Sequence, residues 1–101
     1  SDISMDTTDA YLSRDSPFYT YENRLRTFET WPKQMIPNKY SLAKCGFVYL
    51  GQGDNVKCFH CKVQINQWER TDDPWKEHYK WSSQCYYLEM VGGQSDYDIP
   101  D

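Results

Sequence analysis

Hydrophobic residues at helical spacing begin the ordered pattern of the chain. Tyr21, Leu25 and Phe28 occupy positions i, i+4 and i+7, and Pro32 follows them. This spacing places the three side chains on one helix face, and proline cannot continue a helix. The pattern therefore predicts a short amphipathic helix that starts near Tyr21 and ends before Pro32.

A second, shorter helix is predicted within residues 37–47. Asn38 is a favourable N-cap, and Gly46 suits the left-handed position that follows a helix. Three small or apolar residues between them are expected to face inward: Leu42, Ala43 and Cys45.

The centre of the chain changes to β-prone runs. These are residues 47–50, 56–59 and 65–68, and the first two are separated by the glycine- and Asx-rich residues 51–55. That composition is typical of a hairpin loop. We therefore expect a three-stranded antiparallel sheet, in which a turn through the C-x-x-C motif joins the second and third strands.

Helical character returns near residue 73. Asp73 is a good N-cap and Pro74 suits the first helical position, so a helix is expected to continue through Tyr79. The helices and strands together predict a small α+β domain, in which four to five short helices surround the three-stranded sheet.

Charge is distributed unevenly over the 101 residues. The ends hold seven of the fifteen acidic residues, whereas residues 21–91 hold ten bases and eight acids. We therefore expect flexible acidic tails at 1–17 and 92–101 around a domain at 18–91. The domain has no basic stripe for nucleic acid, and no stretch is apolar for long enough to span a membrane.

The cysteines carry the strongest chemical signal. Cys58, Cys61, His78 and Cys85 have the spacing C-x2-C-x16-H-x6-C, which supplies the four donors of a tetrahedral zinc site. A core of about seventy residues supplies only about 3–5 kcal/mol, so one zinc staple is expected. Three thiolates and an imidazole fill the shell, which predicts a structural zinc and no enzymatic activity.

The zinc site requires a break between its last two ligands. On one unbroken helix His78 and Cys85 would lie about 10.5 Å apart along the axis, whereas ligands of one zinc lie within about 4 Å of each other. Ser82 or Ser83 can end the first helix and cap a short second helix that carries Cys85.

Other uses of the cysteines explain less of the sequence. Two disulfides would require Cys45 and would leave His78 unexplained, and a redox C-x-x-C would open a helix in a βαβ unit. His60 is a rival ligand, but the cysteines on both sides of it already coordinate, so it is interpreted as a surface residue. Cys45 is interpreted as a small buried apolar side chain.

A longer pattern of spaced residues resembles a known family. It runs Arg24-x-x-Thr27-Phe28-x-x-Trp31-Pro32, then Leu42-Ala43-x-x-Gly46-Phe47-x-Tyr49-x-Gly51-x-x-Asp54-x-Val56-x-Cys58-Phe59-x-Cys61, then Trp68-x3-Asp72-Asp73-Pro74-Trp75-x2-His78-x2-Trp81-x3-Cys85. Over about residues 21–90 this resembles the baculoviral IAP repeat (BIR) domain of inhibitor-of-apoptosis proteins.

The resemblance implies a cytoplasmic zinc domain that restrains caspases and is displaced by antagonists with a free N-terminal alanine. Arg24 is expected to be a buried donor, and Trp31 and Trp75 are expected to lie in the core. The isolated domain is expected to be a monomer.

Groove-bearing members of the family add a peptide as a β-strand beside the third strand. The resemblance assigns to that wall Gln64, Ile65, Asn66, Gln67 and Trp68. It assigns to the pocket for the first peptide residue Asp72, Glu77 and Trp81. Two carboxylates beside two indoles would bind a free α-amine and exclude side chains larger than methyl.

One groove position departs from the family. Gln64 stands where glycine is common, so its long side chain is expected to alter contacts with the third and fourth peptide residues. Glu77 and Trp81 follow the family and also share one helix face by their i, i+4 spacing.

The leading interpretation is thus a module that captures N-terminal alanine motifs of IAP antagonists or caspases. Two alternatives remain: a mitotic-type BIR that reads a histone N-terminus, and a zinc-stapled interaction domain with an unused groove. In the N-terminal tail, Asp6 and Asp9 form the Asp-x-x-Asp arrangement that effector caspases prefer. Cleavage after Asp9 would expose Ala10.

Overall fold

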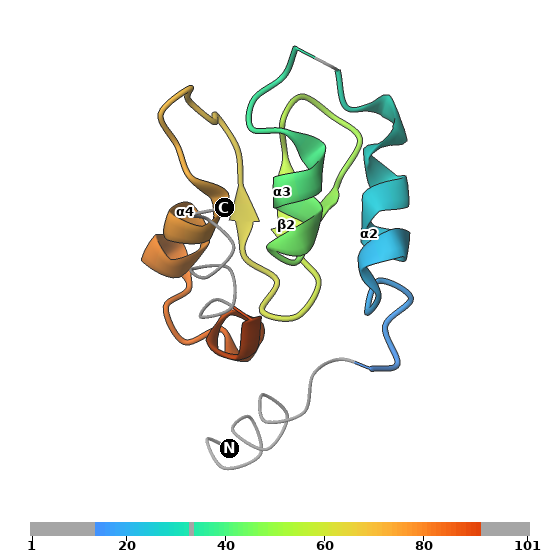
Figure 1. Cartoon of the computed structure of the whole chain (residues 1–101), viewed down its shortest axis with the longest axis vertical. Helices are drawn as coiled ribbons and strands as arrows, with labels where there is room; N and C mark the ends of the chain where they lie inside the picture. The colour runs from blue at the N-terminus through green and yellow to red at the C-terminus, as the bar shows by residue number, and fades with distance from the viewer. Residues whose placement is uncertain (1–13, 33, 92–101) are drawn as a thin grey trace, which may run out of the picture.

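The computed structural model describes residues 14–32 and 34–91. Three expectations therefore lie wholly or largely outside the described residues: the tail at 1–17 as far as residue 13, cleavage after Asp9, and the tail at 92–101. The described part of the chain places helices around a small sheet (Figure 1). The expected α+β architecture with a three-stranded antiparallel sheet is confirmed.

The first predicted helix is divided in two. Helix α2 (Tyr21–Arg26) begins after Thr20, whose side chain accepts a hydrogen bond from the Asn23 amide. It is followed directly by the 3-10 helix η1 (Thr27–Thr30), in which Phe28 departs from helical geometry. The apolar face is kept through this change, because Phe28 is fully buried.

Helix α3 (Lys39–Lys44) begins as the sequence predicts. The side chain of Asn38 accepts a hydrogen bond from the Ser41 amide, which satisfies one free donor of the first turn. The chain leaves this helix at Gly46, whose φ of +100° suits glycine. A Cβ there would lie 2.9 Å from the ring of Tyr87, so the site also has no room for a side chain.

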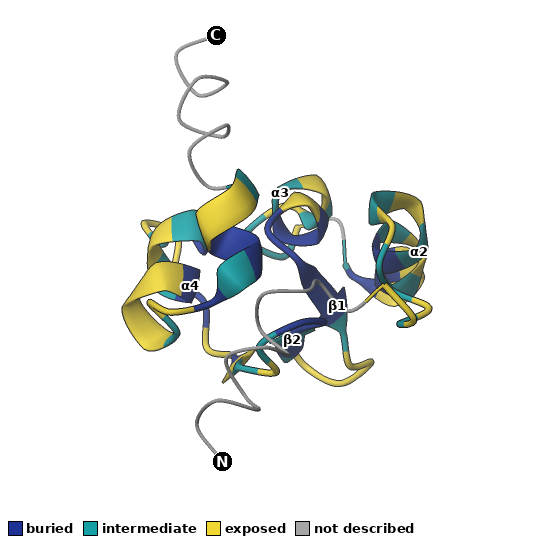
Figure 2. Ribbon diagram, turned by 90° about the horizontal axis from the view of Figure 1, so that it is seen from below, coloured by how far each residue is buried: buried dark blue, intermediate teal, exposed yellow. Residues whose placement is uncertain are grey.

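The sheet has the strand order β1 (Phe47–Tyr49), β2 (Val56–Cys58), β3 (Gln64–Ile65), with both pairs antiparallel. The third strand ends at Ile65, whereas the expected strand continued to residue 68. Residues 66–68 therefore lie outside the sheet. Gln67 adopts a φ of +59°, which turns the chain away from the sheet. Figure 2 shows the buried centre of the sheet among the surrounding helices.

Helix α4 (Pro74–Trp81) is capped by Asp73, whose side chain accepts from the Trp75 amide. It ends at Ser82, where a φ of −150° breaks the helix as the metal geometry required. The short second helix comprises residues 86–91, so Cys85 precedes it rather than lying within it. No helix in the described ranges is both long and apolar enough to span a membrane.

Arg24 joins the N-terminal and C-terminal parts of the domain. Its side chain is only 2% exposed, and its guanidinium donates to carbonyls of Phe18, Tyr19 and Ala43 and to the hydroxyl of Tyr87. Burial lowers the pKa of Arg24, and burial also raises the pKa of Tyr87 to about 12. The expected role of Arg24 as a buried donor is confirmed.

Candidate metal centre and peptide groove

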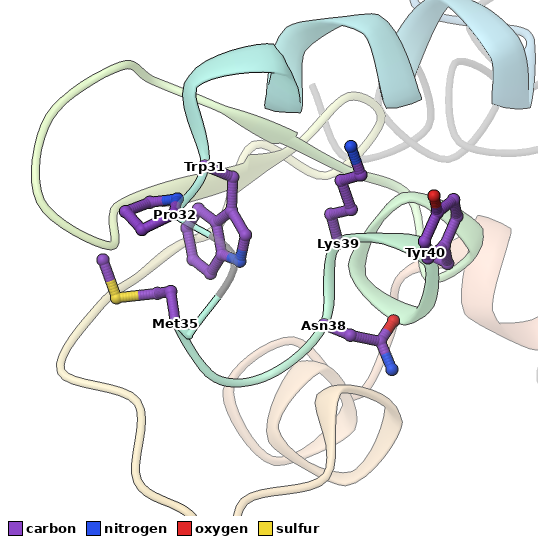
Figure 3. A pocket seen from close by; sticks show the side chains of 6 residues that line it. All are labelled: Trp31, Pro32, Met35, Asn38, Lys39 and Tyr40. Atoms are coloured by element: carbon purple, nitrogen blue, oxygen red, sulfur yellow. The ribbon is translucent and has the colours of Figure 1, made fainter.

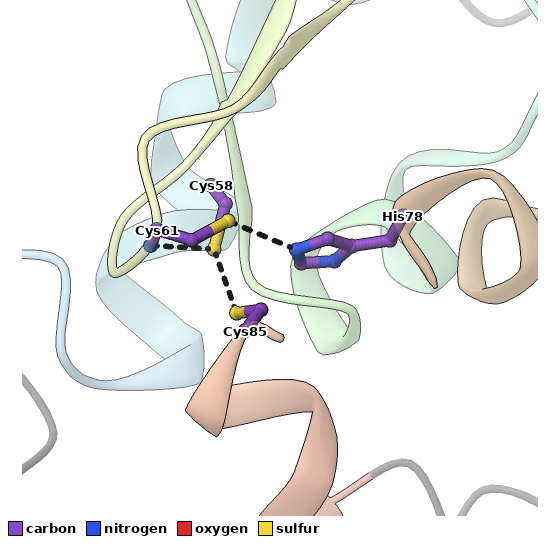
Figure 4. Close-up of side chains that lie close together, drawn as sticks. All are labelled: Cys58, Cys61, His78 and Cys85. Atoms are coloured by element: carbon purple, nitrogen blue, oxygen red, sulfur yellow. Dashed lines mark hydrogen bonds between the residues drawn. The ribbon is translucent and has the colours of Figure 1, made fainter. Parts of the chain in front are cut away.

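The four predicted zinc ligands lie together. Cys58 comes from the end of β2, Cys61 from the turn after it, His78 from α4 and Cys85 from the segment before residues 86–91 (Figure 4). Their ligand atoms all lie within 4.8 Å of one another. The sequence spacing thus identified a cluster that could hold a metal ion.

The distances within the cluster fit zinc. A tetrahedron with Zn–S of about 2.3 Å and Zn–N of about 2.0 Å has sulfur–sulfur edges of about 3.8 Å and sulfur–nitrogen edges of about 3.5 Å. The Sγ atoms of Cys58 and Cys85 are 3.9 Å apart, and Cys61 Sγ is 3.5 Å from His78 Nε2. Two of the six edges of the cluster therefore match a zinc tetrahedron.

The thiol pKa values show how closely the sulfurs interact. Hydrogen bonds to Cys61 and Cys85, followed by burial, raise the pKa of Cys58. Hydrogen bonds with Cys58 and Cys85 lower the pKa of Cys61, which favours its thiolate. These opposite shifts follow from close contact among the sulfurs, and a divalent cation can replace thiol protons in such a cluster because metal ligation requires thiolates.

Further contacts orient two of the ligands. His78 Nδ1 lies 3.0 Å from the carbonyl oxygen of Cys45, which holds the opposite nitrogen, Nε2, toward the cysteines. The amides of His60 and Cys61 point at Cys58 Sγ, at 3.4 and 3.5 Å. These donors stabilise negative charge on that sulfur.

The sequence also predicts the environments of two residues near the cluster, Cys45 and His60. Cys45 is fully buried, as expected, and burial raises the pKa of its thiol. His60 is only 8% exposed, so the expectation of a surface residue is wrong. Its ring lies beside those of Phe59 and Tyr86, with centroids 6.2 and 6.4 Å away. The knuckle is therefore covered by the segment that begins at Cys85.

A hollow runs along the outer side of the third strand. It has a volume of about 380 Å³ and is lined by Val63, Gln64, Ile65, Asn66, Gln67 and Trp81. Five of these six residues were assigned to the groove from the sequence, and Val63 was missed. Trp81 is 60% exposed, although it is one of the largest apolar side chains of the domain.

The remaining assigned residues, Trp68, Asp72 and Glu77, do not line this hollow. The Trp81 indole donates to Glu77 Oε1 at 3.3 Å, which joins the two residues on one face of α4. Asp72 accepts from the Glu69 amide at 2.8 Å. Trp68 is only 7% exposed and packs edge-on against Phe47, so it lies in the core rather than on the open surface.

A residue whose role the sequence did not indicate holds the groove segment in place. The carboxylate of Asp54, in the β1–β2 loop, accepts from the amides of Gln67 and Trp68 at 3.0 and 2.9 Å. These bonds replace the strand pairing that ends at Ile65. Asp54 belongs to the spaced family pattern, but the amides that it binds are 13 and 14 residues away in the sequence. The sequence alone therefore does not indicate these two hydrogen bonds.

A second hollow lies at the N-terminal side of α3 (Figure 3). It has a volume of about 220 Å³, and Trp31 and Pro32 form one side of it, with Lys39 and Tyr40 opposite. Trp31 is mostly buried, as expected, and its indole donates to the Pro37 carbonyl at 3.1 Å. Trp75 is half-buried and packs against the core.

The fold and the cluster define a class: small α+β domains in which three cysteines and a histidine could hold zinc. The sequence model of the family described as BIR, Inhibitor of Apoptosis domain, matches residues 24–89. The chain belongs to this family.

Relatives in viruses and animals agree with this assignment. The chain is 51% identical over 72 residues to protein ORF99 of Ostreid herpesvirus 1 (isolate France), covering 71% of the chain and 29% of that protein. It is 40% identical over 87 residues to Baculoviral IAP repeat-containing protein 3 of Homo sapiens, covering 86% and 14%. The chain thus spans less than a third of these relatives.

A solved structure with the same fold contains a bound peptide. The crystal structure of DIAP1 BIR1 bound to a Grim peptide matches with a TM-score of 0.63 and 44% sequence identity, covering 67% of this chain and 69% of that one.

Proposed function

We propose that this chain is a peptide-binding BIR module that captures free N-terminal alanine motifs of IAP antagonists or of caspases, and so restrains apoptosis. The observation that carries the proposal is the hollow beside β3, which ends at the exposed Trp81. The DIAP1 BIR1 structure with a Grim peptide supports it, because that domain shares the fold at 44% identity.

In this proposal the peptide adds as a strand to the open edge of β3. Its first residue lies at the Trp81 end, where the carboxylates of Glu77 and Asp72 hold the α-ammonium by charge-assisted hydrogen bonds. Gln64, Ile65, Asn66 and Gln67 form the wall beside the peptide. Trp68 supports this wall from the core, because its ring packs against Phe47.

One zinc ion held by the Cys58, Cys61, His78 and Cys85 cluster would be structural. It would join β2, α4 and the last helical segment, and its binding free energy would contribute directly to folding. Four protein ligands complete a tetrahedral shell, so the proposed role is binding without catalysis. We expect the isolated domain to act as a monomer in the cytoplasm.

Isothermal titration tests the proposal with two matched peptides. An alanine tetrapeptide with a free amine should bind, whereas its N-acetylated form should lose about 2–5 kcal/mol, because the acidic pocket then lacks its cation. Trp81→Ala should remove binding of the free peptide while leaving the circular dichroism spectrum and zinc content unchanged. Equal affinity for the free and acetylated peptides would refute the amine pocket.

A further inference from the structure

The open edge of β3 has a defined set of backbone groups. Cys58 N donates to Val63 O at 3.0 Å, and Lys57 is the register partner of Gln64. In an antiparallel pair, hydrogen-bonded and non-hydrogen-bonded positions alternate. Lys57 and Gln64 are therefore a non-hydrogen-bonded pair, and the backbone N–H and C=O of Gln64 point toward the hollow.

The side chains of this pair lie on the outer face of the sheet. Val56 and Ile65 are buried on the inner face, whereas Lys57 is half-buried and Gln64 is exposed. The same outer row includes Val48, the register partner of Lys57 on β1. A peptide residue paired with Gln64 would extend this row by one strand. None of the three residues already in the row is acidic.

The charges along the hollow are arranged asymmetrically. At the Trp81 end lies Glu77, bonded to the indole, with Lys80 placed 5.1 Å from the Trp81 ring centroid. Lys57 does not line the hollow but lies on β2, beside Gln64, which does. The ammonium of Lys62, in the turn before β3, already donates to the Phe59 carbonyl at 2.9 Å. An amine at one end and a carboxylate at the other would complement this arrangement.

We infer that Lys57, acting across Gln64, makes this groove select peptides that carry a free N-terminal amine and an acidic side chain at the fourth residue. The inference rests on the proposed function. The first residue occupies the Trp81 end, so the second residue pairs beside Asn66 and the fourth pairs with Gln64, two strand positions further along. A carboxylate there lies in the Lys57 row, two strands and about 10 Å of backbone separation from Lys57, so the two long side chains must reach over Gln64 for the opposite charges to attract.

The experiment compares three peptides that differ only at the fourth residue: Ala-Val-Ala-Glu, Ala-Val-Ala-Gln and Ala-Val-Ala-Lys. Each has an amidated C-terminus, so that no terminal carboxylate lies near the fourth residue. Affinities are measured by isothermal titration on the folded, zinc-loaded chain in low salt. The glutamate peptide should bind about fivefold more tightly than the lysine peptide, with glutamine between them.

Charge reversal on the protein identifies the residue responsible. Lys57→Glu should reverse the order of the glutamate and lysine peptides, and 1 M salt should remove the preference. Lys44→Glu makes the same change in net charge at an exposed position of α3, outside the groove, and should keep the original order. Circular dichroism and zinc content confirm that each variant is folded.

The outcomes separate this inference from the proposed function. If free alanine peptides bind and acetylated ones do not, but the glutamate and lysine peptides bind equally, the fourth-residue selection is wrong and the groove stands. If the preference persists unchanged in Lys57→Glu, Lys57 is not its source. If no free alanine peptide binds, the proposed function itself fails.

Discussion

Asp54→Ala tests whether the loop between β1 and β2 positions the groove. The substitution removes two hydrogen bonds from backbone amides to a carboxylate, at 3.0 Å to Gln67 and 2.9 Å to Trp68. Bonds to charged groups contribute about 1.5–3 kcal/mol each, and the exposure of the Gln67 bond places it at the low end. The indole nitrogen of Trp68 has no hydrogen-bond partner among the described residues, so the indole itself does not anchor this segment.

We therefore expect Asp54→Ala to lower the free energy of unfolding by about 3–4 kcal/mol. For a domain of this size that loss lowers the Tm by about 10 °C or more. The loss is measured by urea unfolding at fixed zinc concentration. Hydrogen exchange should accelerate most at the amides of Gln67 and Trp68, and the affinity for an alanine tetrapeptide should fall about tenfold.

The neighbouring variant Asn55→Ala is the matched control. Asn55 accepts from Asn66 Nδ2 at 2.7 Å and donates to the Gln52 carbonyl at 2.9 Å, but both bonds are exposed, so the loss should stay below about 0.5 kcal/mol. Equal stability losses for the two variants would refute the special role of Asp54. So would unchanged exchange at the Gln67 and Trp68 amides in Asp54→Ala.

Three further predictions follow from the fold, the cluster and the sequence. Gly46→Ala should destabilise the domain by about 1–3 kcal/mol more than Gly51→Ala, because both positions have positive φ but only the first Cβ meets a ring; urea unfolding compares them. A strong chelator should unfold the domain, and a circular dichroism spectrum retained in chelator would contradict a structural zinc. Incubation with an effector caspase should give a product that begins at Ala10, and its mass should be absent from Asp9→Ala.

The metal cluster could be predicted from sequence because its geometry follows from short-range rules. The C-x-x-C knuckle brings two sulfurs together locally, and the helix repeat shows that His78 and Cys85 require a break. Ser82 provides that break. The burial of His60 could not be predicted in this way, since it depends on Tyr86, a residue 26 positions later in the chain.

The groove was harder to delimit. The residues at 65–68 are β-prone, but propensity does not indicate that Asp54 captures the next amides and ends the strand at Ile65. Trp68 was assigned to the groove because it matches a groove position of the family, and the structure packs its ring in the core beside Phe47. Large aromatic residues at groove and core positions look alike until packing is known.

Helix α4 contributes residues to both the metal cluster and the groove, so one rigid element connects the two sites. Successive residues of a helix differ in direction by about 100°, so His78 faces the cysteines while its neighbour Glu77 lies with Trp81 on the outer face. His78 is fully buried and Trp81 is the most exposed tryptophan, only three residues later. The position of the proposed amine pocket would therefore depend on zinc ligation by His78, which would fix the helix. Because linkage is reciprocal, a peptide that binds only the folded groove would in turn stabilise the zinc-bound state.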